Sequence, residues 1–101
     1  MHGHNHLVEI NIIKAKKNTL NEANAAHGES PTNDTKNHKA YALCSFNIAL
    51  KYFTQTVVPT LKANLKWERN GLKLNPHCAW AHQDARLAEE AYNAALDFLA
   101  A

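Results

Sequence analysis

The feature that most constrains this chain is a stripe of large apolar residues through its middle, where one recurs at every third or fourth position. Steps of this size bring side chains to one face of an α-helix, whereas a half-buried β-strand would need a step of two. The pattern therefore predicts a long amphipathic helix. Its members are Leu43, Phe46, Leu50, Phe53, Val57, Leu61 and Leu65.

A proline lies inside this long helix. Pro59 has no backbone N–H and clashes with the preceding turn, so we expect a kink near Thr56–Val58. The apolar period continues on both sides of Pro59, which indicates that the helix is bent rather than ended there. We expect it to stop at Gly71.

Two further helices are predicted on either side of the long one. The first runs from about His6 to Ala26, and His27-Gly28 follows it as a stop signal. Its expected apolar face holds Leu7, Ile10, Ile13 and Leu20, with Val8, Ile12, Ala15 and Ala23 beside them. The third runs to about Leu99 and begins with Asn75 as N-cap and Pro76 as first helical residue. Its expected apolar face holds Trp80, Leu87, Ala91, Ala95 and Phe98, with Ala88 and Leu99 beside them.

Residues 28–35 combine a proline with short polar side chains, so they predict a loop that ends in an N-cap at Asp34 or Thr35. The fold class is therefore all-α. We expect residues 1–101 to form a single helical domain, with residues 1–5 as a flexible N-terminus. Three amphipathic helices joined by short loops favour a small antiparallel up-down-up bundle. Apolar surface that the bundle leaves uncovered predicts a homodimer or another protein partner.

Charge and hydropathy argue against two classes of partner. Eleven Lys and Arg residues balance nine Asp and Glu residues and are spread along the chain, which does not favour nucleic-acid binding. No run approaches the roughly 20 apolar residues of a membrane helix. The N-terminal residues also lack the pattern of a signal peptide, so nothing in the sequence as written directs export.

No catalytic arrangement emerges from the sequence. Glu89 and Glu90 are adjacent and so diverge on a helix, and no Gly-rich phosphate loop or nucleophile elbow is present. Cys44 and His38 are six residues apart, too far along one helix to act as a nucleophile and base. We therefore expect a protein that is not an enzyme and has no cofactor.

The histidines and cysteines raise the question of a metal site or a disulfide. Cys78 and His82 are four residues apart and so share a helix face, but a zinc or copper site needs three or four ligands and no third is evident. These two residues are metal-ligand candidates that the sequence leaves incomplete. Cys44 and Cys78 allow one disulfide or none, and the apolar surroundings of Cys44 favour a free buried thiol.

Several short segments, in this order, resemble the plant invertase and pectin methylesterase inhibitors, which are secreted four-helix bundles. The segments are Ile-Lys-Ala-Lys (13–16), a polar loop, Ala-Leu-Cys-Ser-Phe (42–46), Val-Pro-Thr-Leu (58–61) and Asp-Ala-Arg-Leu-Ala-Glu-Glu (84–90). The resemblance implies that Cys44 matches a cysteine that pairs with another in the family's Asp-Ala-x-x-Cys-Glu motif. This chain departs from the motif, because Ala88 replaces that second cysteine.

The resemblance also implies a function. Family members insert a Pro-Lys-Phe motif into the active-site cleft of their target, and Pro76-His77-Cys78 is its nearest counterpart here, with only the proline retained. It implies a protein that binds and inhibits a carbohydrate-active enzyme of the plant cell wall and is extracellular. The partner-binding candidates are Pro76, His77, Cys78, Trp80 and Asp84. The alternatives are a helical interaction module that forms a homodimer, and a metal-binding helical protein that uses Cys78 and His82.

Overall fold

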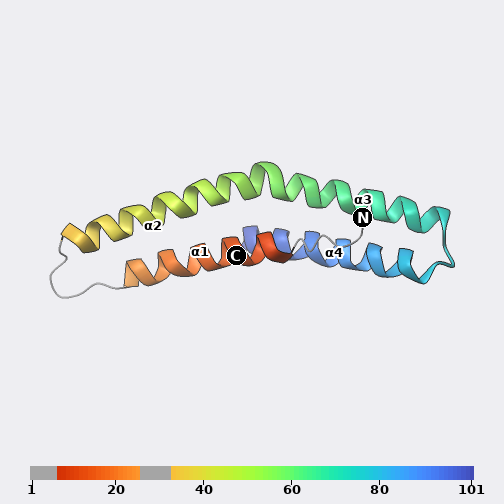
Figure 1. The fold of residues 1–101 in the computed structure, drawn as a ribbon, viewed down its shortest axis with the longest axis horizontal. Coiled ribbons are helices and arrows are strands. Elements are labelled where there is room, and N and C mark those ends of the chain that lie inside the picture. Colours follow the sequence, from red (N-terminus) through yellow and green to blue (C-terminus); the bar gives the residue numbers. More distant parts are fainter. Residues whose placement is uncertain (1–6, 26–32) are drawn as a thin grey trace.

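The computed structural model describes residues 7–25 and 33–101, which form helices and turns and no strand. The helices are α1 (Leu7–Ala25), α2 (Asn33–Tyr52), the π-helical segment η1 (Phe53–Val57), α3 (Val58–Leu74) and α4 (Ala79–Ala100). The segments α2, η1 and α3 follow one another without a break and form a single long helix (Figure 1). The predicted all-α bundle of three helices is confirmed.

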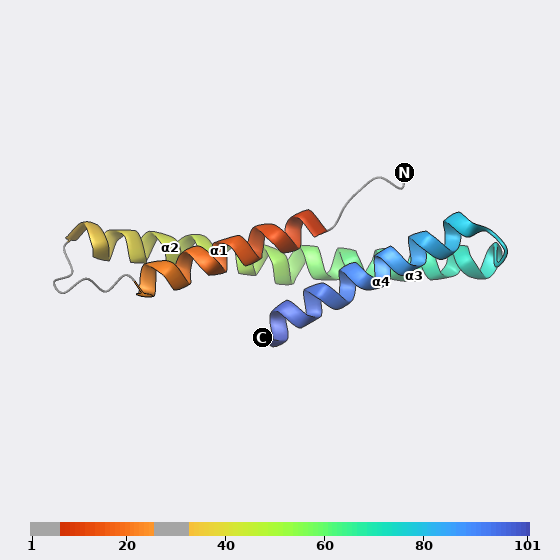
Figure 2. The same ribbon diagram turned by 90° about the horizontal axis from the view of Figure 1, so that it is seen from below.

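The two shorter helices lie end to end along the long one. Helix α1 runs antiparallel to α2, and α4 runs antiparallel to α3, so that α1 and α4 approach each other only near the middle (Figures 1 and 2). At 1.5 Å per residue the long helix is about 63 Å long, and α1 and α4 together have nearly the same length. The molecule is accordingly elongated, with extents of 63 × 23 × 19 Å.

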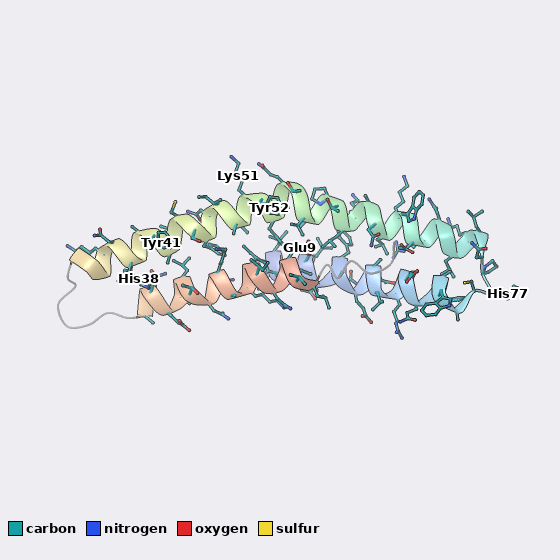
Figure 3. All side chains as sticks on the ribbon, viewed as in Figure 1. Glu9, His38, Tyr41, Lys51, Tyr52 and His77 are labelled. Carbon is teal, nitrogen blue, oxygen red and sulfur yellow. The ribbon has the colours of Figure 1, made fainter. Side chains whose placement is uncertain are left out.

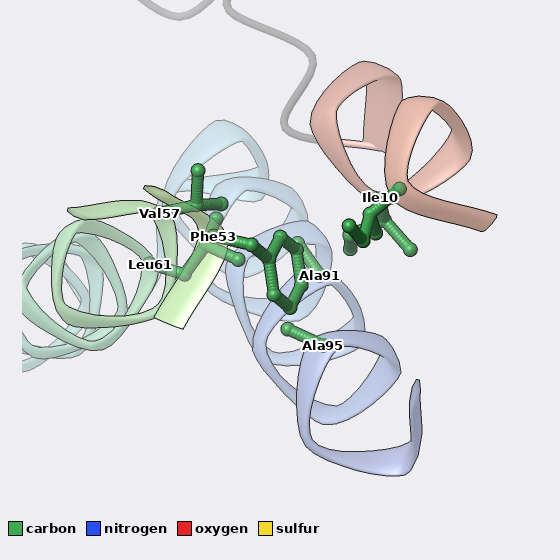
Figure 4. Packing of buried hydrophobic residues seen from close by; sticks show 7 residues of the cluster. Ile10, Phe53, Val57, Leu61, Ala91 and Ala95 are labelled. Carbon is green, nitrogen blue, oxygen red and sulfur yellow. The ribbon is translucent and has the colours of Figure 1, made fainter. Parts of the chain in front are cut away.

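The hydrophobic core lies at this central junction, where all three helices meet. Phe53 is 2% exposed, and its ring packs edge-on against Phe98 with 5.6 Å between ring centroids and a 74° interplanar angle. The ammonium group of Lys17 lies 5.5 Å from the centroid of the same Phe98 ring, which adds a cation–π contact from α1 to α4. The buried residues of the junction are Ile10, Ile13, Phe53, Val57, Leu61, Ala91 and Ala95 (Figure 4).

The kink expected from Pro59 is confirmed and takes the form of a π-helical turn. The backbone N–H of Val58 donates to the carbonyl of Phe53, five residues back, just before the proline. Such a turn accommodates the lost donor and the steric clash of a proline without ending the helix. The long helix bends at this point, concave toward α1 and α4 (Figure 1).

The apolar stripe of the long helix faces the shorter helices, as predicted, except at its first residue. Phe53, Val57, Leu61 and Leu65 are buried, and Phe46 and Leu50 are half-buried. Leu43, in contrast, is 49% exposed, and Ala42 is buried in its place. The face of α2 that packs on α1 therefore continues from Phe46 to Ala42, four residues earlier, and not to Leu43. The small side chain of alanine lets α1 come close.

The predicted apolar face of the third helix is partly wrong. Ala88, Ala91 and Ala95 are buried as expected, and Ala85 joins them. Three large residues assigned to that face are exposed, because the small alanines form the seam toward the long helix and leave larger side chains on the flanks. These exposed residues are Trp80, Leu87 and Leu99.

On α1, the predicted face is confirmed at its centre, where Ile10, Ile13 and Ala23 are buried. The flanking residues Val8 and Ile12 are about half exposed, because they point away from α2. Ala15, which is also exposed, lies on the same outer side. The apolar seam of α1 is therefore narrower than the sequence suggests.

Two predicted helix ends also need correction. Helix α2 begins at Asn33, so Asp34 and Thr35 are inside it and residues 33–35 of the predicted loop are helical. Helix α3 passes through Gly71 and ends at Leu74, since one helical glycine costs only about 1 kcal/mol and packing on α4 offsets it. The expected flexible residues 1–5, the ends at His6 and Ala26, and residues 27–32 lie outside the described part.

Candidate protein-docking site

The residues predicted to bind a partner lie together at one end of the molecule. Pro76, His77 and Cys78 form the turn between α3 and α4, and His77 is at the far end of the structure (Figure 3). Trp80 lies in the first turn of α4, and Asp84 lies one turn further on and is half-buried. The structure therefore brings four of the five candidates to one exposed tip.

Backbone hydrogen bonds define the turn at this tip. The N–H of Asn75 donates to the carbonyl of Gly71 at 3.0 Å, and its side-chain amide Nδ2 donates to the same oxygen at 3.3 Å. The N–H of Cys78 donates to the carbonyl of Asn75 at 3.1 Å, which closes a four-residue turn with Pro76 in its second position. Proline is favoured there because its fixed φ suits the turn.

This geometry corrects the predicted start of the third helix. Asn75 terminates α3, and Pro76 belongs to the turn and not to the helix. Helix α4 begins at Ala79, with Cys78 in an extended conformation as its N-cap and without a side-chain capping hydrogen bond. The same Asn-Pro pair suits a helix start and a tight turn, and here the tight chain reversal selects the turn.

The side chain of His82 holds the turn against α4. Its Nε2 atom lies 2.7 Å from the carbonyl oxygen of Pro76. A carbonyl oxygen only accepts hydrogen bonds, so Nε2 carries the proton in this contact. The imidazole of His82 thus ties the first turn of α4 to the tip.

This contact bears on the predicted metal ligands. Because the Nε2 atom of His82 donates to Pro76, only its Nδ1 atom is left to act as a ligand in this conformation. Within residues 7–25 and 33–101, no three His, Cys, Asp or Glu residues are grouped as a metal site requires. The structure therefore adds no third ligand to Cys78 and His82, and His2, His4 and His6 lie outside the described residues.

Two large apolar side chains flank the turn. Leu74, the last residue of α3, is 80% exposed, and Trp80 is 73% exposed. Tryptophan is among the residues that contribute most to protein–protein binding, because it offers a large apolar area and one N–H donor. An exposed Trp and Leu beside a hydrogen-bonded turn form a surface suited to another protein.

Both cysteines are free and exposed. The expectation of a buried Cys44 is wrong, because its position on α2 points away from the seam with α1. Cys44 lies on the α2 half of the long helix and Cys78 at the opposite end of the molecule. The candidate disulfide between them is therefore not formed.

Sequence reasoning missed a second surface, a groove of 590 Å³ on α3 beside α4. Four cationic residues line it, and their spacing of four, three and four positions was a detectable signal. Apolar and polar residues separate these four in the sequence, so they do not form a continuous run of basic residues. The four are Lys62, Lys66, Arg69 and Lys73.

Comparisons with protein-family models, with curated proteins and with solved structures gave no match. Among the helices in the described part of the chain, none has the length and apolar character needed to cross a membrane. The fold and the surface define an elongated helical protein with an exposed apolar tip.

Proposed function

We propose that this protein is a non-catalytic binding protein that docks another protein through the tip between α3 and α4. The observation that carries the proposal is the exposure of Leu74 and Trp80 on either side of a turn that hydrogen bonds hold in place. A preorganised turn loses little conformational entropy on binding, and burying both apolar side chains would then favour the complex.

The resemblance of the sequence to invertase and pectin methylesterase inhibitors supplies the target class to test. In that family a proline-containing motif enters the target's cleft, and Pro76 lies in the exposed turn here. We propose a carbohydrate-active enzyme of the plant cell wall as the partner. This proposal rests on the resemblance and on the position of the turn.

The test is a titration of the folded protein into purified plant pectin methylesterase and acid invertase, with residual activity as the measurement. Stoichiometric loss of one activity supports the proposal and names the target. No loss of either activity, with a sample shown by circular dichroism to be helical, would refute the proposed target class.

A pair of tryptophan variants tests the tip itself. Trp80 is 73% exposed at the tip, and Trp67 is 74% exposed two turns before the end of α3. We expect Trp80→Ala to remove binding and Trp67→Ala to keep it, since only Trp80 flanks the turn. Equal loss in both variants would argue against docking through the tip.

A homodimer is the second candidate, favoured by a separate exposed surface. Tyr41, Ile48 and Tyr52 are spaced by seven and four residues, so they share one face of α2, and they are 74%, 66% and 59% exposed. The chain has 7384 Å² of accessible surface, whereas a folded monomer of its mass has about 5,700 Å². The excess goes with the elongated shape of the molecule, which leaves more surface open to a second chain than a compact fold would.

Light scattering after size-exclusion chromatography tests the homodimer. We expect a dimer mass for the native chain and a monomer mass for Ile48→Asp, because a carboxylate in an apolar interface would be desolvated. A monomer at all concentrations would refute the dimer and leave docking through the tip untouched.

A further inference from the structure

The groove beside α4 combines positive charge with an apolar floor. Its cationic side chains are exposed, while Leu65 at its base is 6% exposed and Tyr92 of α4 is half-buried at its edge. The residues that line the groove are Pro59, Lys62, Ala63, Leu65, Lys66, Arg69, Asn70, Lys73 and Tyr92.

The four cations form one row along α3. Steps of four, three and four residues place Lys62, Lys66, Arg69 and Lys73 on the same side of the helix, over about 16 Å at 1.5 Å per residue. Neighbours in such a row repel one another, since like charges one turn apart are destabilising. A bound row of anionic groups would relieve this repulsion.

Little negative charge from the protein itself offsets the row. Arg69 pairs with Glu89 across to α4 at 3.8 Å, and both side chains are more than half exposed, so the pair is weak. In the described part of the chain, Arg69 is the one residue of the four with an ion-pair partner. Three lysine ammonium groups therefore face solvent along the groove.

We propose that this groove binds an acidic segment of a partner protein, in which Asp or Glu residues alternate with apolar ones. Carboxylates would pair with the lysines, and apolar side chains would cover Pro59, Ala63 and the ring of Tyr92. The apolar floor favours such a peptide over the phosphate backbone of a nucleic acid, which has no apolar group to place there. This site goes beyond the proposed function, because the tip does not form part of it.

The probe is a fluorescein-labelled peptide of alternating Glu and Leu, long enough to span the row in an extended conformation, in which Glu and Leu lie on opposite faces. A matched peptide with Gln in place of Glu measures apolar binding alone, and a single-stranded oligonucleotide of equal charge measures response to any polyanion. Fluorescence anisotropy gives each affinity. We expect the Glu peptide to bind the native chain more tightly than either control, and the affinity to fall as salt is added.

A triple variant, Lys62→Gln with Lys66→Gln and Lys73→Gln, removes the unpaired charge of the groove. The loss of three exposed ion pairs between these lysines and the peptide carboxylates should weaken binding of the Glu peptide about tenfold. The matched control carries the same loss of net charge at exposed positions on α1 and α2, and should change affinity less than about twofold. The control changes are Lys14→Gln, Lys36→Gln and Lys51→Gln.

Three results would overturn the proposal. Equal weakening by the two triple variants would mean that only net charge matters, and equal binding of the Gln peptide would mean that carboxylates play no part. Tighter binding of the oligonucleotide than of the Glu peptide would assign the groove to nucleic acid. None of these measurements involves Leu74 or Trp80, so their failure is separate from failure of docking through the tip.

Discussion

The exchange of leucine for alanine at two positions tests the position of the core. Leu61 is 1% exposed in the central junction, whereas Leu87, which the sequence assigned to the apolar face of its helix, is 47% exposed. The same chemical change at both sites removes the same atoms. Any difference in the free energy of unfolding therefore reports burial and not side-chain type.

The expected magnitudes follow from that difference. Removal of three buried carbon groups at Leu61 loses about 2.4 kcal/mol of transfer free energy, and the cavity that remains raises the cost to about 3–5 kcal/mol. At Leu87 only about half of the side chain is shielded and no closed cavity forms, so we expect about 1 kcal/mol. A domain of this size has about 5–15 kcal/mol of stability in total, so the first change is severe and the second is mild.

Urea unfolding followed by circular dichroism measures both variants. Protein concentration should be low enough for the chain to be monomeric, so that association does not contribute. Equal destabilisation by Leu61→Ala and Leu87→Ala, or a larger effect at Leu87, would refute the packing of α4 on its alanine seam.

Three further predictions concern the seam, the tip and the thiols. Ala95 is fully buried, so Ala95→Leu should overpack the junction and lower stability by about 1–3 kcal/mol, and an unchanged melting temperature would contradict this. His82→Ala removes the hydrogen bond to Pro76, so amide hydrogen exchange in the turn should become faster and global stability should fall by about 1 kcal/mol. Unchanged exchange in this variant would show that the imidazole does not hold the turn. Cys44 and Cys78 are exposed, so both should react with a thiol reagent in the folded protein as fast as in urea, and protection of either thiol would contradict its position.

The long helix was predictable because its periodicity allows one interpretation. Residues such as Phe46, Leu61 and Leu65 have polar neighbours on both sides, so the apolar period defines one face. Pro59 likewise has a fixed chemical consequence wherever it lies in a helix. What the sequence left open was the form of the disturbance, since a π-helical turn and a simple bend have the same local signal.

The apolar face of α4 was not predictable in the same way. Two overlapping arcs on this helix both repeat at helical spacing, one with Trp80 and Leu87 and one with small alanines such as Ala88 and Ala95. Hydrophobicity favours the first arc, whereas close approach of helix axes favours the second. Only the packing against α3 decides between them, and it selects the alanines.

The candidate site likewise has features that the sequence predicts and features that only the packing of the helices determines. The clustering of Pro76, His77 and Cys78 follows from their position between two predicted helices. The bond from His82 to Pro76 depends on where α4 begins, which the Asn-Pro pair left open. The basic row on α3 was in the sequence as a spacing, but it became a site only when Tyr92 of α4 closed one edge of the groove.

The end-to-end arrangement of α1 and α4 explains both the small core and the large exposed surface. The long helix could contact neighbouring helices on several sides, but along most of its length it packs against only one helix, either α1 or α4. Its flanks therefore stay open, and the radius of gyration is 18.3 Å where a compact domain of this length has about 13 Å. Exposed Tyr41 and Trp67 lie on those flanks, one on each half. Because a lone folded chain seldom keeps so many large apolar residues in water, these open flanks support our proposal that the protein associates with a partner.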